Sequence, residues 1–444
     1  MLMRSRFNTI MMLTLAALLF GSLSMAFAQD GETLRIWTKF NAENPQVASD
    51  FWLAQTIENY AADTGVTLEN TFVVYNEINT RLNVAVQSGG DIPDVSYVDS
   101  QNLGFYVNNG TLLDLTEFVT SADWYDDIDP IALAACTAPT GEILCVPTTT
   151  TNFFTYYWAD VYPDGYPATT EEFLAAAPAV RDAGYYPITF KGAEGASVER
   201  FYYPLMASYG AQVVDDEGRA TWANELSVAA LEFVRELFVN DYVPDVALAP
   251  GFDFETPFKQ GEAGAFVAGT FSYVYLTPLE APSGEIFDAA PPAEGFDTNA
   301  IAVGDAYDGG ELLFAPALSA PGGQPRSMVL ATAWAIPFGS ENVEGAQQFI
   351  NYQMTTQANI DFAVGYGALP TLISAAENEV FSSAYWQAVA QYQAESGIAA
   401  PAWTNYDEAL RLLSTAIVNI VTNPDADILT ELQAAQDEYN LGLQ

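Results

Sequence analysis

Hydrophobic and polar positions along this chain switch between two periods, and the switching predicts strands followed by helices. Short apolar runs at Leu34–Trp37, Val66–Tyr75 and Val95–Val98 have the length and composition of buried strands. Helical spacing fills the segments between them, over Asp50–Thr64 and Ile78–Gln87, and glycine follows each helix. This β-α-β-α-β order predicts a doubly wound half-sheet, which binds ligands at the carboxyl ends of its strands.

The rest of the chain carries mostly helical patterns. Thr169 with Glu172 forms a capping box, which predicts a helix start. Phe258–Phe266 describes a helix that ends on a glycine and leads into a short strand. Further helices are expected at Leu226–Val239, Asp407–Val421 and Asp427–Tyr439. Mixed strands and helices predict an α/β fold, and 444 residues exceed what one core serves, so we expect two lobes.

The first 28 residues have the pattern of a secretory signal. Arg4 and Arg6 precede an apolar run from Ile10 to Phe20, and a small-x-small cleavage site ends at Ala28. No cysteine follows this site, so no lipid anchor is expected. The apolar run is short for a membrane anchor, and no other stretch has spanning length. The protein is therefore expected to be periplasmic or extracellular, without membrane insertion.

Composition argues against several classes of function. The formal net charge is −44, which disfavours nucleic-acid binding because phosphate contacts need a basic surface. The same field disfavours anionic membranes and anionic ligands. The chain has no histidine, which removes Ser-His-Asp and Cys-His catalysis and HExxH zinc sites. We expect no catalytic residue, no metal and no cofactor.

Two local clusters have structural explanations. Cys136 and Cys145 are the two cysteines, and they flank Ala138-Pro139-Thr140-Gly141-Glu142. In a secreted chain this pair predicts a disulfide across a hairpin. The acidic run Asp215–Arg219 predicts a solvated turn, because Arg219 interrupts the alternating ligands of a calcium loop.

Seven motifs follow one another in a fixed order over nearly all the chain after residue 28. They are Leu34–Trp37, Gly90–Val95, Leu112–Leu115, Gly141–Pro147, Tyr156–Tyr157, Phe258–Gly269, and Ala335–Ile350 with Gly367–Pro370 after it. As an ordered set they resemble the extracellular solute-binding proteins of ABC importers, in the maltose-binding-protein-like branch. Trp158 departs from the family pattern, which usually has asparagine after the paired tyrosines.

The resemblance implies a type II periplasmic-binding-protein fold. Two discontinuous α/β lobes are then joined by crossings near Pro147, Pro316 and Tyr352, with the ligand in the cleft between them. Lobe one is expected to comprise 29–147 plus 316–352, and lobe two 148–315 plus 353–444. The family is also typically monomeric, which we take as the expectation here.

A sugar site needs planar side chains that stack on C–H faces and polar groups that bond hydroxyls. Loops after the predicted strands supply the first candidates, namely Lys39, Phe40, Tyr75, Asn76, Asp99, Ser100 and Gln101. The resemblance and the aromatic pattern add Arg200, Phe271, Tyr273, Trp334, Tyr366 and Trp403.

Two of these candidates differ from the family pattern. Arg200 stands where the family often has a stacking aromatic, and we expect it to bond hydroxyls or to pair with Glu199. Phe271 matches a family tryptophan that stacks on sugar, and Tyr273 is expected on the same strand face. The remaining tryptophans at 52, 124, 222 and 386 are expected to be structural.

The resemblance implies a non-enzymatic subunit that captures a carbohydrate and delivers it to the membrane permease by hinge closure. Three alternatives stay open. A polyamine binder would suit the acidity, because carboxylates and aromatic rings grip ammonium groups. A secreted glycosidase would need two facing carboxylates. A sensing role through a membrane receptor is not separable by sequence from import.

Overall fold

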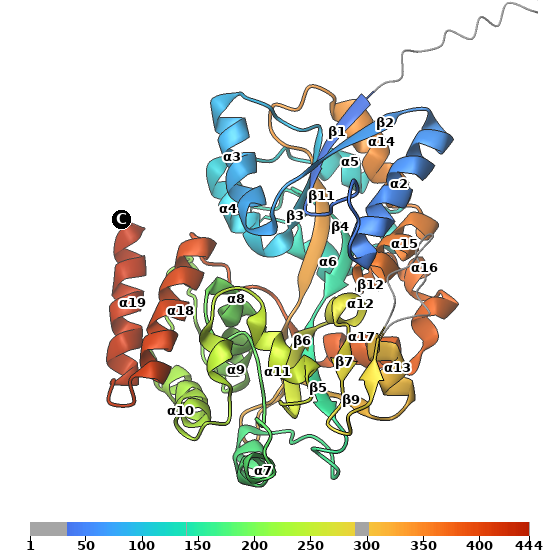
Figure 1. The fold of residues 1–444 in the computed structure, drawn as a ribbon. Coiled ribbons are helices and arrows are strands. Elements are labelled where there is room, and N and C mark those ends of the chain that lie inside the picture. Colours follow the sequence, from blue (N-terminus) through green and yellow to red (C-terminus); the bar gives the residue numbers. More distant parts are fainter. Residues whose placement is uncertain (1–32, 139, 289–301, 444) are drawn as a thin grey trace, which may run out of the picture.

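The computed structural model describes residues 33–138, 140–288 and 302–443. The predicted signal segment 1–28 therefore lies outside the described residues. Within the described ranges, none of the helices combines the length and apolar character needed to cross a membrane. The fold has two lobes, which lie above and below each other in Figure 1.

A six-stranded sheet forms the centre of lobe one, in the order β12-β4-β11-β3-β1-β2. Its strands are β1 (Thr33–Thr38), β2 (Thr67–Phe72), β3 (Val95–Asp99), β4 (Val146–Thr151), β11 (Leu330–Ala335) and β12 (Leu369–Pro370). Strand β1 pairs in parallel with both β2 and β3, whereas β11 runs antiparallel to β3 and β4. The predicted parallel half-sheet is thus confirmed.

Helices connect and cover this sheet. They are α2 (Ala48–Thr64), α3 (Ile78–Ser88), α4 (Leu103–Asn109), α5 (Thr116–Thr120), α6 (Pro130–Ala135), α14 (Val343–Gln353), α15 (Thr356–Tyr366) and α16 (Ile373–Ala376). Gly65 ends α2 at φ +78°, a left-handed conformation that other L-residues rarely adopt. The glycine stop predicted for this helix is confirmed.

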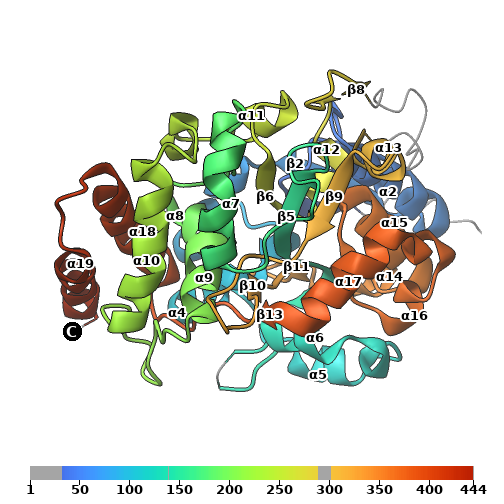
Figure 2. The ribbon, with the colours of Figure 1, turned by 90° about the horizontal axis from the view of Figure 1, so that it is seen from below.

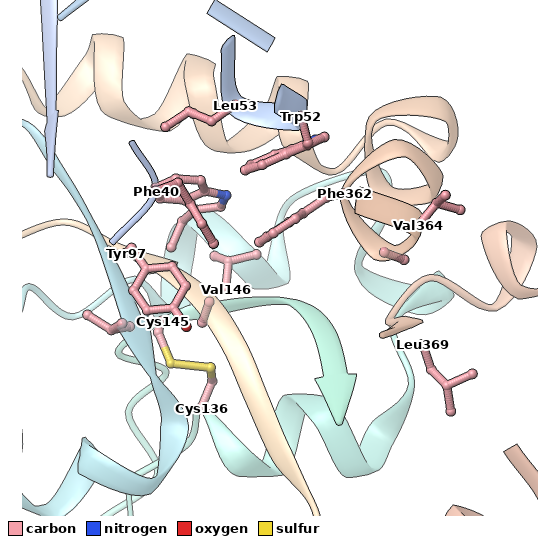
Figure 3. Close-up of a cluster of buried hydrophobic side chains, with 14 of the residues drawn as sticks. Phe40, Trp52, Leu53, Tyr97, Cys136, Cys145, Val146, Phe362, Val364 and Leu369 are labelled. Carbon is pink, nitrogen blue, oxygen red and sulfur yellow. A yellow bond between two sulfur atoms is a disulfide. The ribbon is translucent and has the colours of Figure 1, made fainter. Parts of the chain in front are cut away.

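Aromatic rings fill the space between α2 and α15. Trp52 stacks on Phe362 with ring centroids 4.0 Å apart, and Phe40 meets both rings edge-on. Figure 3 shows these three rings packed beside Tyr97 and Val146. Trp52 is therefore structural, as predicted.

The two cysteines form the predicted disulfide. Cys136 directly follows α6 and Cys145 directly precedes β4, with their Cα atoms 5.1 Å apart. An antiparallel bridge between Thr137 and Ile143 makes the intervening segment a hairpin. Both cysteines are buried under the aromatic cluster (Figure 3).

Lobe two is built on a three-stranded antiparallel sheet in the order β6-β5-β9. Its strands are β5 (Phe153–Trp158), β6 (Ala265–Gly269) and β9 (Leu312–Ala315), with a separate hairpin of β7 (Leu279–Glu280) and β8 (Ile286–Phe287). Tyr157 and Val267 face one buried cluster, whereas Tyr156 and Phe266 face the other. The sheet is therefore buried on both faces.

Helices lie on both sides of this second sheet, as Figure 2 shows. They are α7 (Thr170–Asp182), α8 (Gly195–Ser197), α9 (Tyr203–Ser208), α10 (Glu225–Val239), α18 (Tyr406–Thr422) and α19 (Ile428–Gly442) on one side, and α11 (Thr256–Lys259), α12 (Ser272–Tyr275), α13 (Ala302–Asp308) and α17 (Ala384–Ser396) nearer the other. The Thr169–Glu172 capping box begins α7, as predicted. Asp215–Arg219 is a turn closed by ion pairs from Arg219 to Asp215 and Glu217.

Strand pairing indicates where the chain passes between the lobes. Asn152 separates β4 of the first sheet from β5 of the second. Strand β10 (Ser327–Met328) precedes β11 and pairs in parallel with β13 (Gly397–Ile398). We propose that the three crossings lie at Asn152, at Val329 and between α16 and α17, over residues 377–383.

This proposal replaces the expected boundaries at Pro147, Pro316 and Tyr352. Strand β12 pairs with β4, and Phe362 of α15 stacks on Trp52 of α2. These contacts hold residues 353–376 against the first sheet rather than in lobe two. Prolines and helix ends are local features of the sequence. The position of a crossing depends instead on which sheet the next strand pairs with, and this is decided by long-range contacts.

Candidate ligand-binding site

On lobe one, a lysine lies among tyrosine rings just after β1. The Nζ atom of Lys39 donates a hydrogen bond to the hydroxyl of Tyr366 at 2.7 Å. The same atom lies 4.6 Å from the ring centroids of Tyr75 and Tyr97, and 4.7 Å from that of Tyr366. These distances are typical of cation–π contacts. We call this group, together with Asp99 and Gln101, the tyrosine face.

The polar members of the tyrosine face come from the end of β3 and the turn after it. Tyr97 donates a hydrogen bond to Asp99, and burial followed by the charge of Asp99 raises the pKa of this phenol well above its ordinary value. Gln101 reaches the hydroxyl of Tyr75 at 3.5 Å, and its buried Oε1 has no hydrogen-bond partner. An unpaired buried acceptor is costly, so a ligand hydroxyl would be a favourable partner.

On lobe two, an arginine lies among phenylalanine rings. The Cζ atom of Arg200 is 5.4 Å from the ring centroid of Phe271, 5.9 Å from those of Phe153 and Phe254, and 6.0 Å from that of Phe252. Across the part of the chain that the structure describes, Arg200 has no ion pair and no side-chain hydrogen bond. We call these five residues the phenylalanine face.

Local backbone features place the two main members of this face. Arg200 lies in a π-helical segment (Val198–Tyr202), where Tyr203 donates to the carbonyl of Val198 five residues back. Pro204 has no N–H to return to the carbonyl of Arg200, which favours the wider turn here. Phe271 folds over the end of β6, and a side chain at Gly269 would collide with its ring.

Two buried carboxylates accompany Arg200. Glu199 accepts a hydrogen bond from Tyr406 at 3.0 Å, and burial raises its pKa to about 7. Glu255 accepts from Tyr275 at 2.6 Å, and burial likewise raises its pKa. Each carboxylate thus has a tyrosine hydroxyl as its partner rather than the guanidinium.

The tyrosine and phenylalanine faces lie close together, although they belong to different lobes. A side chain at Gly367, next to Tyr366, would stand 3.3 Å from the Cα atom of Phe271. The pKa of Tyr75 is raised mainly by burial, then by Asp99 and Glu199, and is lowered by Arg200. Tyr75 as a whole residue is 41% exposed, so part of it lies at the accessible surface.

Several predicted site residues are buried rather than exposed in the site, and Phe40 packs directly behind the rings of Tyr97 and Tyr366. Phe40, Trp334 and Trp403 are each 4% exposed or less and pack in cores, so we withdraw them from the ligand set. Ser100 is buried and accepts from the backbone of Ala331, which makes it structural. The side chain of Asn76 lies outside the described part of the chain.

Tyr273 is not on the same face as Phe271. The expected strand is a short helix, α12, which Phe271 precedes. Residues two apart on a helix point in different directions, and Tyr273 stacks on Tyr385 at 4.1 Å. Tyr273 therefore packs within lobe two.

Sequence reasoning missed Tyr97, Phe153, Phe252, Phe254, Glu255 and Tyr275 as neighbours of the site. Tyr97 and Phe153 read as ordinary strand residues, since an alternating aromatic usually marks a core. The segment Phe252–Phe254 offered one signal, because two phenylalanines follow a proline and glycine in an otherwise acidic loop.

Two cavities lie away from this site. One of about 620 Å³ is lined by Arg35, Asp91 and Phe338, and another of about 480 Å³ by Glu194, Asp407 and Arg411. Arg35 and Arg411 are already ion-paired, to Asp91 and Glu408. Neither cavity offers the aromatic rings and unpaired cations of the two faces. The described residues contain no group of three or more His, Cys, Asp or Glu side chains placed to hold a metal ion.

Two α/β lobes with polar and aromatic faces between them define a two-lobed periplasmic binding protein. The family described as bacterial extracellular solute-binding protein matches residues 55–394. The chain belongs to this family. No curated protein matches its sequence.

Solved structures share the fold at low sequence identity. The GacH receptor of Streptomyces glaucescens, described unliganded and with acarbose, is 17% identical with a TM-score of 0.75, and the match covers 93% of this chain and 98% of that one. Maltose-bound T. maritima MalE3 is 18% identical with a TM-score of 0.76, and the match covers 93% of this chain and 100% of that one. A solute-binding protein of Thermotoga lettingae bound with α-D-tagatose is 18% identical with a TM-score of 0.76. That match covers 93% of this chain and 100% of that one.

Proposed function

We propose that this protein is the solute-binding subunit of an ABC importer and that it captures a carbohydrate between its lobes. It would act outside the cytoplasm, in the periplasm or beyond, and deliver its ligand to membrane permease subunits without altering it chemically. The observation that carries the proposal is the pairing of the tyrosine face with the phenylalanine face within a solute-binding fold. Rings can stack on sugar C–H faces while the polar groups bond hydroxyls.

The crossings proposed above suit a hinge. Two of the crossings, at Asn152 and Val329, are single residues, and they lie side by side because Thr151 pairs with Leu330. A ligand that contacts both Tyr366 and Phe271 would favour the closed arrangement by its extra contacts there. Family relatives whose solved structures hold maltose, acarbose or tagatose support a saccharide as that ligand.

The alternatives weigh less against this geometry. A polyamine would meet Lys39 and Arg200, two cations that repel its ammonium groups. A glycosidase would need two carboxylates facing each other across the sugar, and membership of a solute-binding family gives it no support. Release of reducing sugar from polysaccharides would support the enzyme instead.

A thermal-shift screen tests the proposal. The purified protein is melted with mono- and oligosaccharides, polyamines and amino acids. A ligand that binds only the folded state at about 100 times its Kd adds about 2.7 kcal/mol of stability. We expect a shift with saccharides. A shift with polyamines or amino acids and none with saccharides would overturn the proposal.

A further inference from the structure

If the protein captures a saccharide as proposed, we infer that this saccharide carries a carboxylate. The geometry points to a uronic acid or a short oligouronate, with the acid group against Arg200 and within the field of Lys39. This inference names the chemical class of the ligand, which neither the family nor the fold fixes. It rests on the charges that face each other between the two lobes.

Each face supplies one cation, and neither cation has a carboxylate partner within the described residues. Lys39 has a tyrosine hydroxyl and tyrosine rings around it, and Arg200 has phenylalanine rings alone. The chain holds 57 acidic and 13 basic residues, so carboxylate partners are abundant. Five other cations do find such partners, namely Arg35, Arg181, Lys191, Arg219 and Arg411, whereas Arg81, Arg235, Lys259 and Arg326 form no ion pair within the described residues but lie outside the two faces.

Three acids near the site accept hydrogen bonds from tyrosines, although the charge of Arg200 also acts through space on Glu199 and Glu255. Tyr97 donates to Asp99, Tyr406 to Glu199 and Tyr275 to Glu255. This arrangement leaves the guanidinium of Arg200 with its donors free. Half-buried cations surrounded by rings have lost part of their hydration. An anionic ligand would replace the lost hydrogen bonds to water with charge-assisted hydrogen bonds.

The overall charge does not contradict an anionic ligand. The net charge of −44 is spread over the whole surface, and salt screens it beyond about 8 Å at physiological ionic strength. Within that range the ligand meets Lys39 and Arg200, and of the acids it meets Asp99, Glu199 and Glu255, each of which already accepts a hydrogen bond from a tyrosine. The net negative charge therefore opposes the approach of an anionic ligand from a distance more than its contacts in the site.

A carboxylate fits better than a phosphate. The planar guanidinium pairs with a carboxylate through two parallel hydrogen bonds. A sugar phosphate carries nearly two negative charges and would face Asp99, Glu199 and Glu255 at close range. The phenylalanine rings beside Arg200 offer the pyranose ring a surface for stacking.

Isothermal titration calorimetry tests the inference with matched ligands. Glucuronate, galacturonate and digalacturonate are compared with glucose, galactose, a neutral disaccharide and glucose 6-phosphate. We expect the acidic sugars to bind at least about tenfold more tightly than their neutral parents, because a charged hydrogen bond is added. This preference should shrink as salt is raised from about 0.02 to about 0.5 M.

Variants locate the effect. R200Q should weaken uronate binding about 30-fold and neutral-sugar binding about threefold at most, and K39Q should do the same to a smaller extent. R181Q is the control, because it removes the same charge from an exposed ion pair with Asp241 on lobe two. It should leave every affinity unchanged.

Each result has a definite meaning. Neutral sugars that bind as tightly as uronates, with R200Q affecting both equally, would overturn the carboxylate while leaving carbohydrate capture intact. Tighter binding of glucose 6-phosphate would likewise overturn it. If the folded protein binds no saccharide of any kind, the proposed function fails as well.

Discussion

The tyrosine face and the phenylalanine face each surround one cation, but with different chemistry. Three of the four rings around Lys39 are phenols, which bring hydroxyls, and the fourth is Phe40, whereas the rings around Arg200 are all phenyl rings, which bring none. A phenol can discriminate between hydroxyl patterns, and a phenyl ring can only stack. We propose that lobe one reads the positions of ligand hydroxyls and that lobe two supplies apolar ring surface and one charge.

The largest expected effect concerns the core behind the tyrosine face. Phe362 packs on Trp52, Phe40 and Tyr366. It therefore supports Tyr366, whose hydroxyl accepts the hydrogen bond from Lys39. F362A should destabilise the fold by about 3–5 kcal/mol, because a buried ring leaves a cavity. Urea denaturation measures the change. F338A is the control, since Phe338 is 59% exposed, and an equal loss there would contradict the prediction.

The next effect belongs to the phenylalanine face and depends on pH. Burial raises the pKa of Glu199 from 4.5 to about 7, so the folded protein binds this proton more tightly than the unfolded chain. Stability is therefore lost as the pH rises from about 4.5 to about 7. E199Q keeps an acceptor for Tyr406 without the charge, and at pH 8 it should be more stable than wild type by up to about 3 kcal/mol.

Denaturation of both proteins at pH 4.5 and pH 8 checks this expectation. At the lower pH the two should have nearly the same stability, because the carboxyl is protonated in the folded protein and about half protonated in the unfolded chain. A gap that is independent of pH would show that the charge of Glu199 does not cause it.

A third, smaller effect separates two aromatics that the sequence treated alike. Phe271 lies beside Arg200, whereas Tyr273 stacks on Tyr385. F271A should weaken saccharide binding about tenfold, the value of one lost ring contact, with little change in stability. Y273L should lower the melting temperature and leave affinity unchanged. Calorimetry measures the affinity of both variants, and thermal melts measure their stability. If Y273L loses affinity and F271A does not, Tyr273 and not Phe271 belongs to the site.

The smallest effect is expected for one hydroxyl. Tyr366→Phe keeps the ring beside Lys39 but removes its hydrogen-bond acceptor. The change should reduce affinity severalfold, corresponding to about 1 kcal/mol, and should alter the ranking of sugars that differ at one hydroxyl. Tyr125→Phe, outside the site, is the control. If affinity falls by the same factor for every sugar, the tyrosine face does not read hydroxyls.

Much of the fold was predictable because its signals are local. The Thr169–Glu172 capping box, the glycine after α2 and the cysteine pair across a hairpin each act within about ten residues. The candidate site was predictable in part. Lys39, Tyr75, Asp99, Gln101, Tyr366, Arg200 and Phe271 do gather between the lobes.

The misplaced candidates share one cause. Phe40, Trp334 and Trp403 follow or lie in elements that approach the site, yet their side chains turn into the cores. An aromatic residue suits a core and a sugar site equally well, so its type does not tell which one it serves. Only the packing of α15 against α2 shows that Phe40 points inward.

By itself the sequence determined the α/β class, the order of elements, the disulfide and the ordered motifs of a solute-binding family. These features depend on periodicity, capping and motif order, which are local properties of the sequence. The tertiary structure decided the crossings between lobes and the composition of the two faces. Strand β12 joins the first sheet from residue 369, and Arg200 meets Phe153, Phe254 and Phe271 from three distant segments. Such contacts depend on long-range packing, which no local pattern specifies.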